Sequence, residues 1–176
     1  PSTVIGNEKP IHWRLFTSHP VHTVEQALHF IQCYRWRWVI EQVFRTLKIK
    51  GLNIEKSEVE KQERLTNLGT LALLAAVQVL QLVQARDGNT QQKISTVFTP
   101  EEITCLNKLN HTLEGKTSKQ KNPHPPEALA YASWVIARLG GWKGYHGKKA
   151  RPPGPITMLN GVIRFYDILI GFNLLL

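Results

Sequence analysis

The segment that decides the fold is residues 34–48, YRWRWVIEQVFRTLK. At about 100° of rotation per residue, its apolar side chains fall on one side of a helix. We expect this side to face the core, and it consists of Trp36, Val39, Ile40, Val43 and Leu47. Beside it, within an arc of about 60°, lies a polar stripe that consists of Tyr34, Arg37, Glu41 and Lys48. The segment therefore predicts a long amphipathic helix with one polar stripe.

Two interpretations of the polar stripe are open on spacing alone. Arg37 and Glu41 are four residues apart and could form an ordinary surface ion pair, worth roughly a few tenths of a kcal/mol. Alternatively, Glu41 is a ligand of Mg²⁺ or Mn²⁺, which prefer carboxylate oxygens, and Arg37 and Lys48 neutralise nearby phosphates. Two such ions can activate a water molecule and stabilise the leaving oxygen of a phosphodiester. Tyr34 would then hydrogen-bond a phosphate oxygen or stack on a base.

Capping boxes predict where two helices begin, and a proline at the first helical position marks the start of a third. Thr23 with Gln26 opens the long helix, and Gly51 closes it. A second helix begins at a Ser57–Glu60 box and runs to about Arg86, and a third begins at Thr99-Pro100 and ends near Gly115. Two more helices are expected, over residues 127–139 and from about Thr157 to the C-terminus. The fold class is therefore mainly α.

One strand is expected among these helices. Residues 11–17, IHWRLFT, alternate in polarity and are rich in residues that favour strands. A single strand cannot form a sheet, so its partners would lie outside this chain or in another copy.

The charge of the chain favours a nucleic acid as its partner. Its 176 residues carry 22 Lys and Arg against 13 Asp and Glu, a formal net charge of +9, which suits an anionic partner. Residues 116–151 hold eight of these cations against Glu127 alone. Contact with the DNA backbone is expected there, with a solvated basic loop as the alternative. The cations that we expect to bind DNA are Lys143, Lys148, Lys149 and Arg151.

The apolar run over residues 68–85 is long enough to be mistaken for a membrane span. Gln78, Gln81 and Gln84 form a polar stripe along it, and three amides facing lipid would be costly. A buried helix in a soluble core is the better interpretation. No membrane partner is therefore expected, although a basic protein at a membrane surface stays a third and weaker option.

The polar stripe fits the pattern Y-x2-R-x3-E-x6-K, and by this pattern the chain resembles the DDE transposases of the insertion-sequence-four group, which includes the transposon-five transposase. Residues 11–20 resemble the strand that precedes this helix in the family. Residues 137–142 and the helix around Gly161 resemble the family's C-terminal domain.

The resemblance implies roles for particular residues. Glu41 matches the glutamate of the catalytic triad and would be a metal ligand, with Mg²⁺ or Mn²⁺ as the cofactor of the intact enzyme. Tyr34, Arg37 and Lys48 match residues that contact transposon-end DNA near the cleavage site. Trp13 matches a tryptophan that stacks beside a flipped base, and a core aromatic residue is the alternative for it.

The chain departs from the family in its carboxylates. The family carries two aspartates upstream of the glutamate, whereas the first aspartate here is Asp87. Residues 1–40 are also too few for the family's ribonuclease-H-like sheet. We therefore expect the C-terminal portion of a transposase, with the end of the ribonuclease-H-like core over residues 1–90. An all-helical DNA-binding and dimerisation domain is expected over residues 91–176.

These observations lead to one main function and one alternative. The intact protein would be a transposase that hydrolyses and transfers DNA strands, and this chain, with Glu41 alone, is predicted not to cleave DNA. The alternative is a non-catalytic helical protein that binds DNA or inhibits an active transposase. Double-stranded transposon ends are the expected partner, and no small-molecule substrate is expected. The apolar end of the last helix either packs on the core or forms a homodimer contact.

The cysteines suggest the compartment. Cys33 and Cys105 are isolated and form no disulfide framework, and no signal peptide opens the chain, so we expect a cytoplasmic, nucleoid-associated protein.

Overall fold

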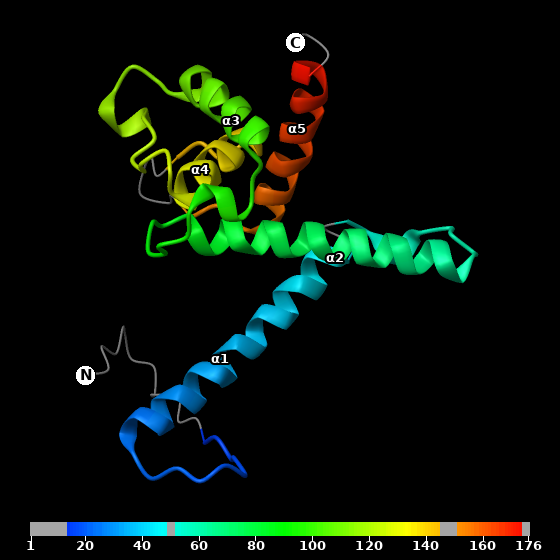
Figure 1. Ribbon diagram of the computed structural model, residues 1–176, viewed down its shortest axis with the longest axis vertical. Coiled ribbons are helices and arrows are strands. Elements are labelled where there is room, and N and C mark those ends of the chain that lie inside the picture. The colour runs from blue at the N-terminus through cyan, green and yellow to red at the C-terminus, as the bar shows by residue number, and fades with distance from the viewer. Residues whose placement is uncertain (1–13, 49–51, 145–150, 174–176) are drawn as a thin grey trace. The chain divides into compact units, whose positions relative to one another are not determined.

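The computed structural model describes residues 14–48, 52–144 and 151–173. These residues form helices and contain no strand, so the mainly α prediction is confirmed (Figure 1). The long helices are α1 (Val24–Leu47), α2 (Gln62–Ala85), α3 (Pro100–Leu113), α4 (Leu129–Leu139) and α5 (Pro155–Asn173). The short 3-10 helices are η1 (Ile54–Lys56), η2 (Ile94–Thr96) and η3 (Ser118–Gln120).

The chain divides into two compact units, residues 1–40 and residues 41–176. The first unit holds the start of α1, and the second holds its last turns and all the other helices. The domain boundary predicted between residues 90 and 91 stays a prediction.

The predicted strand over residues 11–17 is wrong in its described part. Arg14–Thr17 have no strand structure, and residues 11–13 lie outside the described residues. Alternating polarity is not sufficient for a strand, because its backbone N–H and C=O groups need a neighbouring strand to pair with. The described residues provide no such neighbour.

The beginning of α1 agrees with the predicted capping box. The Gln26 backbone N–H donates to Thr23 Oγ1 over 3.2 Å, and the Thr23 N–H donates to Gln26 Oε1 over 3.3 Å. The helix ends at Leu47, earlier than predicted, and the Lys48 N–H still donates to the Phe44 carbonyl over 3.0 Å. Gly51, the predicted stop, lies outside the described residues.

The prediction that the apolar side of α1 faces a core is wrong. Trp36 and Ile40 are each 57% exposed. Val39, Val43 and Leu47 are half-buried, and the buried residue of this helix is Thr46. Helical periodicity identifies an apolar side correctly, but burial also needs an element to cover that side. The described residues contain no sheet that could do so.

The helix α2 combines a buried half with an exposed half. It begins at Gln62, not at the predicted Ser57–Glu60 box, because Ser57 Oγ accepts from the Val59 N–H instead of capping a helix. Its C-terminal half is a core helix as predicted, with Val79, Leu82 and Ala85 fully buried. Before Gln78 it exposes five large apolar side chains: Leu65, Leu71, Leu73, Leu74 and Val77. By length and composition α2 is apolar enough to cross a membrane, although a third of the relevant window is buried in the protein.

The core of the second unit is built around α4. This helix packs against α2, α3 and α5 (Figure 1), and the residues from Leu129 to Ala137 are all buried. The Ser133 hydroxyl donates to the Leu82 carbonyl over 2.7 Å, which satisfies a buried polar group between α4 and α2. Phe165 of α5 is fully buried and makes an edge-to-face contact with Phe98, with 5.9 Å between ring centroids.

The helices α4 and α5 approach closely at two glycines. A Cβ atom on Gly161 would lie 1.9 Å from the Ile136 carbonyl oxygen, and one on Gly140 would lie 2.0 Å from the Thr157 carbonyl oxygen. No side chain fits at either position without a movement of backbone. This contact brings the end of α4, which Trp142 follows, close to the start of α5.

The beginning of α3 follows the predicted pattern closely. Pro100 occupies the first turn, and Thr99 and Glu102 form a reciprocal capping box.

Candidate nucleic-acid interface

The polar stripe lies on the part of the chain with the least burial. Arg37, Glu41 and Lys48 are exposed, and Tyr34 is half-buried. Tyr34, Arg37 and Glu41 lie within the continuous helix α1, and Lys48 directly follows its last residue. The carboxylate of Glu41 is therefore accessible from solvent and is not enclosed in an apolar interior.

The Arg37 guanidinium lies against two aromatic rings of the same helix. Its Cζ is 5.5 Å from the centroid of the Tyr34 ring and 5.3 Å from that of Trp38. Such contacts restrict the motion of a long cationic side chain. A held guanidinium is well suited to a phosphate, because its planar fork makes two parallel hydrogen bonds to oxygen atoms.

Lys48 is paired at the other end of the stripe. Its Nζ lies 3.4 Å from Glu55 Oε1, and both side chains are more than half exposed. An ion pair this exposed contributes little stability, so the ammonium can exchange the Glu55 carboxylate for another anion at small cost.

Three residues expected to bind DNA lie outside the described residues: Trp13, Lys148 and Lys149. Lys143 and Arg151 are described, and both are exposed. The Arg151 backbone carbonyl accepts a hydrogen bond of 3.0 Å from the Trp142 Nε1–H. This bond connects the two ends of the loop that carries most of the predicted DNA-binding cations.

The described residues do not fit a two-metal site by themselves. Among them, no group of three or more His, Cys, Asp or Glu side chains converges to hold an ion. Glu41 supplies one carboxylate, and a divalent ion needs several oxygen ligands. Any such site would therefore need carboxylates from outside the described part of the chain.

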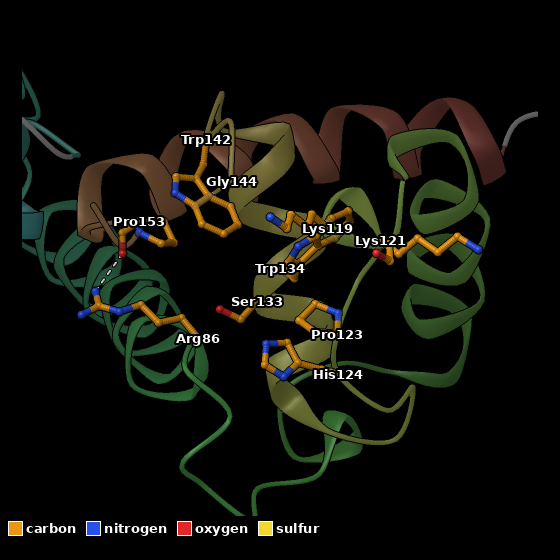
Figure 2. A pocket seen from close by; sticks show the side chains of 11 residues that line it. Arg86, Lys119, Lys121, Pro123, His124, Ser133, Trp134, Trp142, Gly144 and Pro153 are labelled. Carbon is orange, nitrogen blue, oxygen red and sulfur yellow. Dashed lines mark hydrogen bonds between the residues drawn. The ribbon is translucent and has the colours of Figure 1, made fainter. Parts of the chain in front are cut away.

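The second unit contains a basic pocket that the sequence did not reveal. Its volume is about 240 Å³, and Figure 2 shows it between the end of α2, the loop after α3, the helix α4 and the loop after α4. No Asp or Glu is among the residues that line it. Its cationic and aromatic lining comes from Arg86, Lys119, Lys121, His124, Trp134 and Trp142.

Arg86 forms one wall of the basic pocket. Its Nη1 donates to the Pro153 carbonyl over 2.8 Å, a bond drawn in Figure 2, and its Nε lies 3.4 Å from Asp87 Oδ2. The side chain is 24% exposed, so the guanidinium is held in place yet reachable. Burial lowers the pKa of His124 on the adjoining wall, although a hydrogen bond with the Arg86 backbone and the Asp87 carboxylate both act to raise it. The His124 ring uses its N–H for the hydrogen bond to the Arg86 backbone, so the neutral ring has one nitrogen left as an acceptor.

The loop that carries Lys119, Lys121 and His124 is fixed by amide and carboxylate hydrogen bonds. The Glu114 carboxylate accepts from Asn110 Nδ2 over 2.9 Å and from the Asn122 backbone N–H over 3.1 Å. Asn122 Nδ2 in turn donates to Asn110 Oδ1 over 2.9 Å and to the Tyr131 carbonyl over 3.1 Å. These bonds hold the pKa of Glu114 below its usual value, and the bond from Asn110 has the largest effect. The pocket is consequently preorganised.

Sequence reasoning missed half of this pocket for a physical reason. Lys119, Lys121 and Trp142 belong to the basic segment that it selected. Arg86 was not selected, because it follows a different helix and meets this segment only through the packing of α2 on α4. His124 and Trp134 lie within the basic segment, but nothing in the sequence singled them out.

Comparison with known protein families gives a match to residues 5–78 of the chain. This segment contains the whole polar stripe and α1, together with most of α2. The narrower resemblance to the insertion-sequence-four group stays a prediction. Residues 5–78 match the family described as the transposase DDE domain, and this match supports a transposase-family function for the chain.

Proposed function

We propose that this chain acts on DNA as part of a transposase, with the polar stripe placed against the DNA backbone near the cleaved bond. The observation that carries the proposal is that the segment matching the transposase DDE domain contains an exposed carboxylate flanked by exposed cations: Glu41, Arg37 and Lys48. Glu41 would provide one carboxylate of a divalent-metal site. Tyr34, Arg37 and Lys48 would bind the phosphates, because cations of this kind neutralise the backbone. Such a role would place the chain in the cytoplasm with the nucleoid.

We also propose that the 176-residue chain does not cleave DNA by itself. No aspartate precedes Glu41, and the described residues bring no other carboxylates together around an ion. One carboxylate cannot position the pair of ions that in-line displacement of a phosphodiester uses. The remaining ligands would come from other parts of the intact transposase.

The polar stripe is tested by DNA binding. Arg37→Gln should weaken the affinity for duplex DNA roughly tenfold, because a charged hydrogen-bond donor to phosphate is lost. Arg35→Gln is the matched control: Arg35 is exposed on the same helix but lies about 100° from Tyr34 and outside the stripe. Fluorescence anisotropy with a labelled duplex measures both variants. Equal effects of the two substitutions would contradict the role of the stripe.

The inactivity is tested by strand cleavage. We expect the purified chain to leave duplex DNA carrying the element's own terminal sequence uncut in Mg²⁺ or Mn²⁺. Cleavage that Glu41→Gln abolishes would overturn this part of the proposal and show that the chain completes its own metal site.

A non-catalytic role is the second candidate function. The same shortage of carboxylates favours it, because a chain that binds transposon ends without cutting them would compete with an active transposase. Addition of the chain to an active transposase of the same element should then lower its cleavage rate. The Arg37→Gln variant should inhibit less than Arg35→Gln.

A further inference from the structure

The basic pocket has the charge of a site for an anion. Arg86, Lys119 and Lys121 supply the charge, and no acidic side chain lines the cavity. Figure 2 shows the Lys121 side chain extending away from the cavity, so Arg86 and Lys119 are the lining cations that we consider for a bound group. Arg86 already forms an ion pair with Asp87, whereas Lys119 is exposed. A phosphate group at the mouth of the pocket would be stabilised by both cations.

The aromatic wall indicates that the ligand is more than a phosphate. Trp134 is buried at 8% exposure and has the Arg138 guanidinium 5.5 Å from its ring centroid. Trp142 is half-buried, and its indole is oriented by the bond to the Arg151 carbonyl. The Trp142 N–H is already donated to the Arg151 carbonyl, so what its indole offers a ligand is a stacking surface for a planar ring, worth about 1–3 kcal/mol per base in single-strand binding proteins.

The polar groups inside the pocket suit the edge of a nucleobase. The His124 ring donates its N–H to the Arg86 backbone carbonyl, so its other nitrogen is left as an acceptor for a base N–H group. The Ser133 hydrogen is likewise already donated to the Leu82 carbonyl. The volume of about 240 Å³ lies just below the range of about 300–1,000 Å³ that is typical of small-molecule sites. The space therefore suits a single nucleotide rather than a longer segment of strand.

We propose that the basic pocket binds one unpaired nucleotide of a DNA single strand, with its phosphate at Arg86 and Lys119 and its base against Trp142. The proposal rests on the proposed function of the chain as a DNA-acting protein. It adds a second contact, separate from the polar stripe, that distinguishes an unpaired strand from a duplex. The hydrogen bonds of Glu114 and Asn122 hold the pocket ready for this ligand and lower the conformational cost of binding.

The test compares three DNA probes with the purified chain: a fluorescent ten-thymidine strand, a ten-unit abasic strand and a blunt duplex. We expect the thymidine strand to bind about tenfold more tightly than the abasic strand. Trp142→Ala should remove this difference, and Trp142→Phe should retain most of it. Free thymidine 5′-monophosphate, added as a competitor, separates a site for a free nucleotide from one that needs a strand, and displacement of the strand at equal concentration would contradict the single-strand assignment.

The charge of the pocket is tested by a matched pair of lysines. Lys119→Glu should weaken thymidine-strand binding about tenfold more than Lys116→Glu, because Lys116 is exposed on the same loop but does not line the pocket. Both lysine substitutions lie on an exposed loop, so circular dichroism of these two variants should show an unchanged fold. The lysine pair therefore tests the pocket even if Trp142→Ala disturbs the fold. Equal effects of the two lysine variants, together with equal binding of thymidine and abasic strands, would overturn the pocket but leave DNA binding intact. Failure of all three probes to bind would overturn the proposed function as well.

Discussion

Glu114 shows how one carboxylate can order a basic loop. It accepts hydrogen bonds from Asn110 and from the Asn122 backbone, and these bonds lower its pKa. Since the pKa is lower in the folded state than in the unfolded chain, the carboxylate stabilises the fold above its ordinary pKa of 4.5. This stabilisation is lost as the pH falls through that value towards the folded pKa.

We predict that Glu114→Gln lowers the free energy of unfolding by about 1–2 kcal/mol at pH 7. The difference from the unsubstituted chain should begin to shrink below about pH 4.5, where Glu114 takes up a proton in the unfolded chain before it does so in the folded protein. Urea unfolding followed by circular dichroism at pH 7 and at pH 4 measures both values. A difference that stays constant across this range would show that the Glu114 charge plays no part.

The helices α4 and α5 depend on a glycine that helix propensity would disfavour. Gly161 lies inside α5, where glycine costs about 0.5–1 kcal/mol relative to alanine. Its position is explained by packing, because a Cβ atom there would lie 1.9 Å from the Ile136 carbonyl oxygen. The backbones of the two helices touch at this point, so a methyl group would have to push them apart.

We predict that Gly161→Ala destabilises the chain by about 1–3 kcal/mol. Gly171→Ala is the control in the same helix: nothing lies within 4 Å of its Cβ position, so this substitution should be neutral or stabilising by up to about 1 kcal/mol. Thermal unfolding of the two variants gives the comparison. A Gly161→Ala variant as stable as Gly171→Ala would contradict the close approach of the helices.

Local sequence signals predicted the helices better than their surroundings. The capping box at Thr23 and the helix start at Thr99-Pro100 were confirmed, because such signals depend on residues a few positions apart. The Ser57 box was wrong, although its spacing was equally good, since the helix begins at Gln62. The burial of Trp36 and Ile40 was also wrong, because burial depends on what packs against a helix and not on its own periodicity.

The two candidate sites differ in the same respect: one could be predicted from local sequence and the other could not. The polar stripe could be identified from sequence, because one helix carries all or nearly all of it in a fixed pattern. The basic pocket could not, because Arg86 and Trp142 are 56 positions apart and converge only once α2, α4 and their loops have packed. Tertiary packing has no short-range signal in a single sequence.

Most of the net positive charge of the chain lies in residues 116–151, the segment where DNA contact is expected. The net charge is +9, and Lys143 and Arg151 lie exposed at the two described ends of the loop after α4. A basic surface of this kind binds the DNA backbone by releasing counterions, so its contribution should appear as a dependence of affinity on salt. This dependence is independent of whether the chain cleaves DNA.

We predict that the double variant Lys143→Gln/Arg151→Gln flattens the salt dependence of duplex binding. Each lost phosphate contact should reduce the slope of log affinity against log salt concentration by about 0.9, so the slope should fall by nearly 2. The fold should be unaffected, because the contact from Trp142 is made to the backbone carbonyl of Arg151 and not to its side chain. Anisotropy titrations between about 50 and 200 mM salt measure the slope. The control is Lys93→Gln/Arg164→Gln, which removes the same charge from exposed positions elsewhere in the second unit. If both double variants flatten the slope equally, the DNA contact depends on net charge and not on the loop after α4.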